Sequence, residues 1–404
     1  MNTKTVSGKI PTQQNIKAMH LKAIFLKALN ANGISRAQLT QELHISFPSV
    51  SALVDELLEA GLLQECGTVE RAQRGRPRGM LRCVSTAFAV PVAVMTREGY
   101  QLSLFDCCGQ LLQECFLPYL EHPADSQEPW QPVEDVLCLP LETQIRQLRQ
   151  QYVLSPELVM CAPGSINTKG RLTSSAMQMA ASSEFFPRLE RTLGMGICMI
   201  NSSDADAYAE KLFQPLPEDF VFVHMGRGVG AGIIRKGKIF ADTHMRAGEI
   251  GHISVDYRGV PCSCGNRGCL ERYVNISQIT REAAELLAAE PDFDTVARAF
   301  RQKDPRITEL MKEKARLLAV GISNLLTVQP VKHIVLGGKI QLLGDGFLEE
   351  VRTAVEGSGF QKYMNQLTVT YTQNTAASGA LGAFWNYLDH EWKLTLKKEG
   401  NDHV

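Results

Sequence analysis

The sequence has no apolar run that approaches the roughly 20 residues a transmembrane helix needs, and its N-terminal stretch has no apolar core of the kind found in signal peptides. It also lacks a regular cysteine framework, because its 11 cysteines are odd in number and scattered along the chain. Disulfide-rich secreted domains have even, closely spaced cysteines. We therefore expect a cytoplasmic protein whose thiols stay reduced.

An excess of charge of one sign is also missing, because 42 basic and 43 acidic residues give a net charge of −1. The distribution is uneven, however. Residues 1–82 contain 11 Lys and Arg against 6 Asp and Glu, a balance of +5, which leaves −6 for the rest. A basic N-terminal region, residues 1–82, before an acidic remainder suggests that the N-terminal region contacts a polyanion. We call this region the head and the remainder the body. With 404 residues, the chain is long enough for two or three domains.

The most informative motif is a group of potential metal ligands. His252 precedes a segment that reads Cys262-Ser-Cys264-Gly-Asn-Arg-Gly-Cys269-Leu-Glu271. Cysteine thiolates and a neutral imidazole are the ligands of closed, tetrahedral zinc sites, and glycines at 265 and 268 allow the turn between them. The spacing predicts one structural zinc ion per chain, bound by His252, Cys262, Cys264 and Cys269. The alternative is three unrelated buried cysteines and a core histidine.

Three helices and a hairpin are predicted in the first 84 residues. Apolar residues recur at helical spacing over 16–31, a second helix follows the N-cap Ser35, and a third follows Ser46, with Pro48 tolerated in its first turn. Residues 62–66 and 81–84 are typical of paired strands around an arginine-rich loop. This arrangement indicates a winged helix-turn-helix, whose third helix enters the DNA major groove.

Two surfaces of this head are expected to contact DNA. The small side chains in the first turns of the third helix let it lie deep in a groove, and Arg-Gly-Arg-Pro-Arg suits an A·T-rich minor groove. The alternative is a three-helix protein–protein module with a solvated arginine loop. The candidate DNA contacts are Ser46, Phe47, Pro48, Ser49, Ser51, Ala52, Arg74, Arg76 and Arg78.

From about residue 88, short apolar runs alternate with helical patterns, which predicts an α/β fold with helices on sheets. We expect a hairpin over 89–95 and 100–105, and a long proline-containing surface loop over 118–140. Further strands are predicted over 158–162, 195–200, 220–224 and 333–336, and helices over 142–152, 276–326 and 376–387.

A series of motifs follows the winged helix: Pro163-Gly164, Gly228–Gly232, Gly248-Glu249-Ile-Gly251-His252, the cysteine cluster with Leu270-Glu271, Gly337-Gly338, and Gly379–Ala383. Over essentially the whole chain, this order resembles the ROK family (repressors, uncharacterised reading frames and kinases), and most closely its repressor branch. The resemblance implies a two-lobed actin-like ATPase (sugar kinase) fold behind the winged helix-turn-helix. It implies a DNA-binding domain at 1–84, a first α/β lobe at 86–199 plus 376–398, and a second lobe at 200–375 with the zinc site, the effector cleft and the dimer interface.

The resemblance also shows which parts of a kinase are missing. ROK kinases have an Asp-x-Gly-Gly-Thr phosphate turn, whereas the equivalent hairpin here, 94–99, has neither the acid nor the glycine pair and is unsuited to a triphosphate. In ROK kinases the catalytic base is the Asp of an Asn-Asp-x-Asn motif, and a Glu follows it by eight residues. If Glu210 is that Glu, the base position is Ser202. If the alignment is shifted by two residues, the base position is Asp204. Serine has no useful basicity near pH 7. We therefore expect no catalytic residues and no enzyme; the alternative is a ROK-type sugar kinase with an appended DNA-binding domain.

The sugar-binding half of the cleft is better preserved. Glu249, His252, Glu271 and Asn201 match positions that bind sugar hydroxyls in the family, and Ser202 would lie beside them. His252 would use one ring nitrogen on zinc and the other on the ligand. The alternative for either carboxylate alone is a solvated surface acid. The glycines of 228–232 and 337–338 resemble nucleotide turns, but we expect them to serve close strand–helix packing.

These patterns predict a sequence-specific DNA-binding transcriptional regulator, in the first place a repressor of genes for carbohydrate uptake or metabolism. Its expected controller is a sugar or sugar-derivative effector, or a partner protein such as a component of the phosphotransferase system. A single small DNA-binding domain binds DNA weakly, so a homodimer or dimer of dimers on a pseudo-palindromic operator is expected. An interaction hub controlled by docking alone is the remaining alternative.

Overall fold

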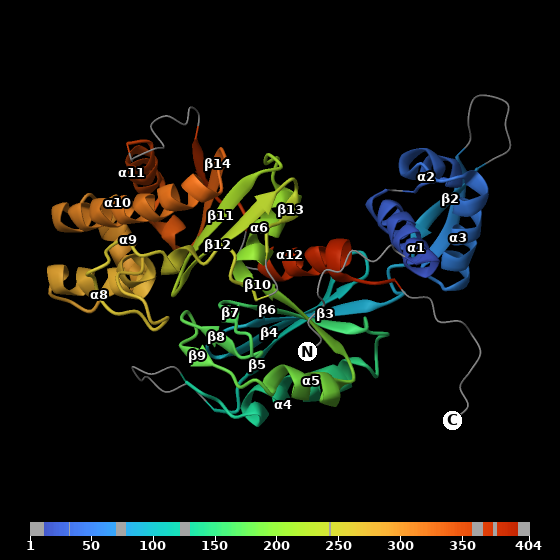
Figure 1. The fold of residues 1–404 in the computed structure, drawn as a ribbon, viewed down its shortest axis with the longest axis horizontal. Helices are drawn as coiled ribbons and strands as arrows, with labels where there is room; N and C mark the ends of the chain where they lie inside the picture. Colours follow the sequence, from blue (N-terminus) through green and yellow to red (C-terminus); the bar gives the residue numbers. More distant parts are fainter. Residues whose placement is uncertain are drawn as a thin grey trace.

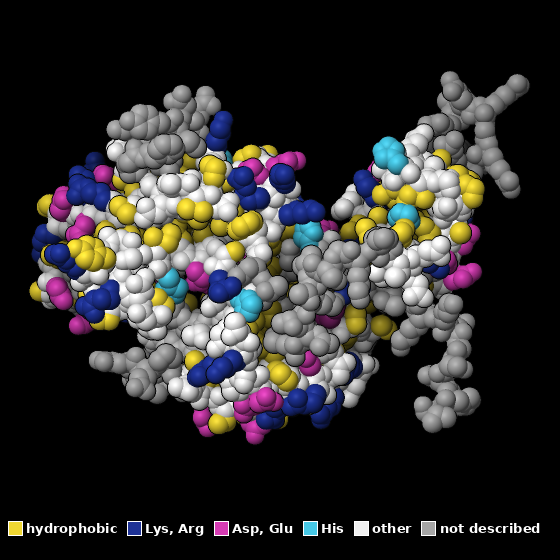
Figure 2. All heavy atoms as spheres, in the orientation of Figure 1, with side chains coloured by type: hydrophobic (Ala, Val, Ile, Leu, Met, Phe, Trp, Pro, Cys, Tyr) yellow, Lys and Arg dark blue, Asp and Glu magenta, His cyan; other side chains and the backbone are white. Residues whose placement is uncertain are grey.

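The computed structural model describes residues 12–31, 33–69, 78–121, 130–241, 244–357, 367–374 and 378–394. Within these ranges the chain forms a small N-terminal head and a larger body built on two five-stranded sheets (Figure 1). None of the helices in these ranges has the length and apolarity that a membrane crossing requires. On the face of the body seen in Figure 2, basic and acidic side chains are interspersed.

The head has the predicted three helices and hairpin: α1 (Gln13–Asn30), α2 (Arg36–Leu43), α3 (Phe47–Glu59), β1 (Leu63–Val69) and β2 (Arg78–Cys83). Ser35 caps α2 in a complete capping box with Gln38, and Ser46 caps α3 by accepting a hydrogen bond from the Ser49 N–H. The two strands pair in antiparallel register. The apolar face predicted for α3 is buried, with Val50, Val54 and Leu57 fully inaccessible.

The first sheet of the body has the strand order β10-β6-β3-β4-β5. Its strands are β3 (Ala89–Met95), β4 (Gly99–Asp106), β5 (Leu111–Pro118), β6 (Glu157–Ala162) and β10 (Gly196–Asn201). Alternate residues face opposite sides. One side packs on α4 (Glu134–Leu148) and α5 (Phe185–Leu193), and the other packs on α12 (Ser378–Asn386). A small sheet of β7 (Ser165–Ile166), β8 (Leu172–Ser174) and β9 (Met179–Ala180) lies beside it.

The second sheet has the order β13-β12-β11-β14-β15. Its strands are β11 (Phe220–Met225), β12 (Val229–Arg235), β13 (Lys238–Ile239), β14 (His333–Gly338) and β15 (Thr368–Tyr371). One face is covered by a helical layer, and the other by α6 (Ser202–Phe213). That layer contains α7 (Glu271–Val274), α8 (Ile276–Leu287), α9 (Phe293–Arg301), α10 (Pro305–Val328) and α11 (Asp345–Glu356), with the 3-10 turns η1 (Ile250–His252) and η2 (Lys339–Leu343).

Helices α6 and α12 pack against each other at the junction of the two lobes, and glycines make this packing close (Figure 1). A Cβ added to Gly382 would lie 2.0 Å from the Ala205 carbonyl oxygen, and one added to Gly232 would lie 2.1 Å from that of Ser203. A Cβ at Gly337 would likewise lie 2.2 Å from the Phe222 ring. The prediction of close strand–helix packing is therefore confirmed at Gly232, whereas Gly337 packs against a ring of the neighbouring strand β11.

The head docks on the body through the segment that follows α12 and the π-helical turn Tyr387–Glu391. The Trp392 ring packs 5.2 Å from both the Phe25 ring of α1 and the Phe88 ring, which precedes β3. Lys22 Nζ donates to the Trp392 carbonyl oxygen at 2.7 Å. The hydrophobic core of the head therefore continues into the core of the first lobe.

The predicted loop over 118–140 was partly wrong. Helix α4 begins at Glu134 and contains Pro140, and it ends at Leu148 rather than 152. A proline inside a helix removes one hydrogen bond, but α4 buries apolar residues on both sides of it, including Val136, Leu141 and Ile145. Strand β5 was not anticipated, because several of its apolar side chains, among them Leu111 and Phe116, are exposed rather than alternating with polar ones.

Candidate metal centre and effector cleft

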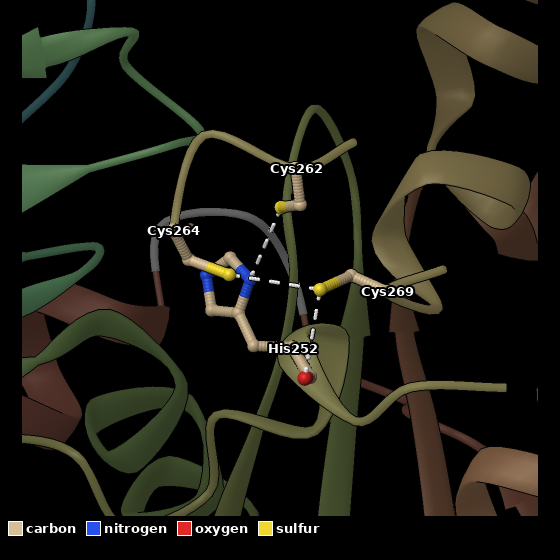
Figure 3. Close-up of side chains that lie close together, drawn as sticks. All are labelled: His252, Cys262, Cys264 and Cys269. Atoms are coloured by element: carbon tan, nitrogen blue, oxygen red, sulfur yellow. Dashed lines mark hydrogen bonds between the residues drawn. The ribbon is translucent and has the colours of Figure 1, made fainter. Parts of the chain in front are cut away.

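The loop between η1 and α7 brings four potential metal ligands to one point. One ligand atom each of His252, Cys262, Cys264 and Cys269 lies within 4.8 Å of all the others (Figure 3). Bridges between Ser254 and Cys269 and between Pro261 and Arg267 fold the loop back on itself. Gly268 is required at the return, since its φ is +64° and an added Cβ would lie 1.7 Å from the Asp256 carbonyl oxygen.

The spacing of these atoms fits a tetrahedral ion. His252 Nδ1 lies 3.7 Å from Cys262 Sγ, and Cys264 Sγ lies 3.6 Å from Cys269 Sγ. Ligands at the usual Zn–S and Zn–N distances would be about 3.5–3.8 Å apart at the corners of a tetrahedron. Burial and the neighbouring thiols raise the pKa of Cys269. A cation at the centre is what would stabilise these sulfurs as thiolates, so the donor set is chemically suited to Zn²⁺.

His252 joins this cluster to a second group of polar side chains, the candidate effector site. Its Nδ1 faces the sulfurs, while its Nε2 lies 3.8 Å from Glu249 Oε2. Glu249 precedes η1, and Gly248 before it has a φ of +82° because its backbone passes close to Ala231 of β12. Burial, and then the negative charge of Glu271, raise the pKa of Glu249 to about 7, and a hydrogen bond with Asn201 opposes this shift. His252 therefore belongs both to the candidate metal site and to the group of polar side chains around Glu249.

The other residues of this group are fixed by hydrogen bonds, most of them with backbone groups. Glu271 begins α7, and its Oε2 accepts from the Val229 N–H and from Ser175 Oγ, both at 3.1 Å. Asn201 ends β10 and caps α6. Its Oδ1 accepts from the Ser203 N–H at 2.8 Å, and its Nδ2 donates to the Gly164 carbonyl oxygen at 3.0 Å.

The structure thus groups four of the five cleft residues expected from the sequence. Asn201, Glu249, His252 and Glu271 are linked by the contacts above, whereas the Ser202 hydroxyl is 3.7 Å from Cys161 Sγ on β6. Sequence reasoning missed Ser175, which bonds to Glu271 from a position 96 residues away. Its place shortly after the Pro163-Gly164 turn was the only signal, and nothing in the spacing pointed to a carboxylate partner.

Side-chain contacts hold the β3–β4 turn and the turn between β11 and β12, the two turns that the resemblance predicts at the place of kinase nucleotide turns. In the β3–β4 turn, Thr96 Oγ1 accepts from the N–H groups of Glu98 and Gly99 at 3.3 and 3.2 Å. Glu98 in turn lies 3.6 Å from Arg227, in the turn between β11 and β12. Gly228 of that second turn faces Glu271, since a Cβ added there would lie 3.1 Å from Glu271 Oε2.

The head presents the start of α3 to solvent. Ser46, Phe47, Pro48, Ser49 and Ala52 are exposed, and Ser51 is half-buried. Ser46 Oγ and Ser49 Oγ are hydrogen-bonded at 2.8 Å. The acidic residues of α3 lie further along it, and two of them form ion pairs, Asp55 with Arg36 and Glu56 with Lys17. The candidate contacts Arg74 and Arg76 lie outside the described residues. Arg78 begins β2, and its side chain also lies outside the described part.

Comparison with known proteins gives a consistent group of relatives. A sequence model of the ROK family matches residues 116–390. The chain is 25% identical to the putative xylose repressor of Caldicellulosiruptor sp. (strain Rt8B.4), with 85% of this chain and 89% of the relative covered. It is 24% identical to the DNA-binding transcriptional dual regulator NagC of Escherichia coli (strain K12), with 91% and 92% covered.

Two solved structures share the fold. A ROK family transcriptional regulator, described as a homologue of the E. coli MLC protein, superposes with a TM-score of 0.75 at 22% identity and covers 93% of this chain and 97% of its own. The ROK hexokinase of Thermus thermophilus superposes with a TM-score of 0.58 at 22% identity, and covers 74% of this chain and 98% of its own. The fold is therefore that of ROK regulators and ROK sugar kinases, as the sequence predicted.

Proposed function

The chain belongs to the ROK family, and from that premise we propose that it is a DNA-binding transcriptional repressor of sugar-metabolism genes. The observation that carries the proposal is the share of this chain that each kind of relative matches. The xylose repressor and the regulator NagC compared above match 85% and 91% of this chain, whereas the hexokinase structure covers 74%. The difference between the solved regulator and the hexokinase is about a fifth of the chain, which is the size of the winged head.

The proposed DNA reader is the head, residues 1–84. Its α3 presents small side chains at the end where the helix dipole is positive, which favours approach to phosphates. Residues 46–52 would lie in a major groove, and Arg74, Arg76 and Arg78 in the adjacent minor groove. Two such heads on a homodimer, or four on a dimer of dimers, would match a pseudo-palindromic operator.

The proposed sensor is the cleft between a first lobe, residues 86–199 plus 376–398, and a second lobe, residues 200–375. Asn201, Glu249, His252 and Glu271 would bind the hydroxyls of a sugar or sugar derivative, with Ser202 at the rim. One zinc ion bound by His252 and the three cysteines would be structural, because four protein ligands leave no open position. Zinc would also orient His252 toward the effector.

We propose further that the protein does not transfer phosphoryl groups. The support is the closed β3–β4 turn and serine at position 202, which leave neither a phosphate cradle nor a base in that frame. A regulator with these properties acts in the cytoplasm. The phosphotransferase system is a proposed source of a protein partner.

Effector binding would reach DNA through the junction of the lobes. Asn201 caps α6, α6 packs on α12, and the chain after α12 holds the head through Trp392. A sugar that favours one lobe arrangement would change how the heads are placed, by as much as its affinity differs between the two arrangements.

The direct test is selection of DNA from a random-sequence pool by the purified chain. The expected result is convergence on a two-fold symmetric site that binds more tightly than scrambled duplex by about 10³ or more at physiological salt. Failure to converge would overturn the DNA-reading proposal and leave an interaction hub, which a pulldown would then identify.

A further inference from the structure

A polar hollow of about 620 Å³ lies on the first lobe, away from the effector cleft. It is lined by Gln131–Glu134, the β7–β8 hairpin loop Asn167–Lys169 with Arg171, and Ala180 with Ser182 and Ser183. None of the cleft residues lines it. Its volume falls within the range of small-molecule sites, roughly 300–1,000 Å³.

Two basic side chains, Lys169 and Arg171, line this hollow. Neither Lys169 nor Arg171 forms a salt bridge within the described residues. Arg171 Nη2 donates to Gln131 Oε1 at 3.0 Å, but its Nε is shielded from solvent and has no acceptor. Buried polar groups in native proteins are nearly always hydrogen-bonded, so an unpaired buried donor indicates a missing acceptor. A guanidinium offers its N–H groups in a planar fork that suits oxyanions.

The backbone holds these cations in place before any ligand arrives. Asn167 Oδ1 accepts from the Lys169 N–H at 2.9 Å and from the Arg171 N–H at 3.0 Å. The Asn167 N–H donates to the Arg171 carbonyl oxygen at 3.0 Å, which closes the loop. Gly170 between them has a φ of +77°. The tight turn therefore fixes where both side chains begin, so less conformational freedom is lost on binding.

The single carboxylate in the lining does not neutralise them. Glu134 lies in the first turn of α4 and accepts a hydrogen bond from Ser182 Oγ. It keeps its negative charge there, and no salt bridge joins it to Lys169 or Arg171 among the residues that the structure describes. The hydroxyl of Ser183 and the amide of Gln131 remain along the same lining as further polar groups.

We propose that this hollow binds a phosphate group, carried by a small phosphate monoester or present as inorganic phosphate. The dianion would accept from the guanidinium of Arg171, once that side chain turns toward it, and from Lys169 Nζ. The hairpin that carries these cations also reaches the effector cleft: Gly164, just before β7, accepts from Asn201, and Ser175, just after β8, donates to Glu271. The site does not depend on the proposed DNA-binding function, and its failure would leave that function untouched.

The test is thermal unfolding of the full-length protein in a phosphate-free buffer. Additions of inorganic phosphate, glycerol phosphate and acetate are compared with sodium chloride at equal ionic strength. We expect a saturable rise in the unfolding temperature with a phosphate compound and not with chloride. A rise with glycerol phosphate alone assigns the site to esters, a rise with inorganic phosphate alone assigns it to the free ion, and equal rises show that the phosphate group is bound from either source.

Variants locate the binding. Arg171→Gln is expected to weaken phosphate binding by about tenfold or more, and Arg171→Lys to recover only part of it, because lysine keeps the charge and lacks the fork. Lys169→Gln, at an exposed position where folding is not at risk, is expected to weaken it as well. Arg191→Gln on the exposed surface of α5 is the matched charge control and should leave binding unchanged. Phosphate that stabilises no more than chloride, an equal effect of acetate, or wild-type binding by both Arg171→Gln and Lys169→Gln would overturn the proposal.

Discussion

Glu98 Oε1 lies 3.6 Å from Arg227 Nη1 and joins the β3–β4 turn to the turn between β11 and β12, the two turns that the family resemblance predicts at the place of kinase nucleotide turns. Both side chains are half exposed, so the ion pair itself adds little to stability, about 0–1 kcal/mol. The ion pair matters because it shows that the two turns lie next to each other. In the β3–β4 turn, the N–H groups of Glu98 and Gly99 donate to Thr96 Oγ1 and are therefore not available to a phosphate. The carboxylate of Glu98 points to the turn between β11 and β12, where its negative charge would repel a triphosphate.

We therefore predict that the purified protein phosphorylates no hexose. The measurement is transfer of label from ATP across a panel of hexoses, with a ROK hexokinase as the positive control. Glu98→Ala is expected to remain inactive, because removing the acid does not free the N–H groups held by Thr96. Turnover above the protein-free blank by the wild-type chain would establish the alternative of a kinase with a DNA-binding head.

Removing one sulfur is predicted to remove the metal. Cys264→Ala leaves three of the four ligand residues, and zinc content should fall from about one ion per chain to near zero, with a lower unfolding temperature. Metal content is measured by mass spectrometry after gel filtration. Cys115→Ala, on β5 outside the cluster, is the matched control and should keep its zinc. Equal metal content in the two variants would count against the site.

The buried carboxyl of Glu210 on α6 predicts a pH dependence of stability. Burial, and then the charge of Asp206, raise its pKa from 4.5 to about 7, and it accepts a hydrogen bond from Thr372. A raised pKa in the folded state means that the protonated form favours folding. This stabilisation is fully present below pH 4.5 and is lost as the pH rises through about 7.

Glu210→Gln keeps an acceptor for Thr372 and removes the ionisation. It is expected to flatten the profile between pH 4.5 and 7 and to stabilise the protein above that window, by about 1–3 kcal/mol. Thermal unfolding across the pH range is the measurement, with Glu285→Gln on the exposed face of α8 as the control. A profile for Glu210→Gln that runs parallel to the wild-type profile would contradict the assignment.

Two substitutions in the head are predicted to weaken DNA binding in different ways. Phe47 is 53% exposed at the start of α3, where an aromatic ring can contact a thymine methyl group. Phe47→Ala should weaken binding to the selected operator by about 1 kcal/mol without changing its salt dependence, because no charge is lost. Arg76→Ala should both weaken binding and reduce the salt slope by about one.

Fluorescence anisotropy with labelled operator across a salt series distinguishes the two effects. Phe213→Ala, an exposed phenylalanine at the end of α6, is the control for loss of an aromatic surface side chain. An unaltered affinity for Phe47→Ala would remove α3 from the base contacts, and an unaltered slope for Arg76→Ala would remove the wing from the phosphate contacts.

Local chemistry made much of the fold predictable. Ser35 and Ser46 are N-caps whose side chains bond a nearby N–H, so the starts of α2 and α3 could be placed from sequence. Strand β5 and the start of α4 could not. Leu111 and Leu112 are apolar yet exposed, and Pro140 lies inside α4 because burial of its neighbours outweighs one lost hydrogen bond.

The candidate site also has a part that could be predicted from the sequence and a part that could not. The metal ligands lie within 18 positions of one another, and their spacing alone predicted that they would meet. The contacts of Glu271 with Val229 and Ser175 join segments 42 and 96 residues apart, and these depend on the tertiary fold rather than on local spacing. Family resemblance placed Ser202 beside the cleft, but its hydroxyl contacts Cys161, a pairing that no local pattern indicates.

Control of a DNA reader by a sugar cleft is tested most directly by reciprocal titration. A sugar that stabilises the protein in a thermal screen is added to the complex with selected operator, and operator affinity is measured with and without it. The expected result is a change in operator affinity by a factor that the operator also imposes on sugar affinity, as linkage requires. A sugar that binds the cleft and leaves operator affinity unchanged, or a failure of every sugar to bind, would contradict this control.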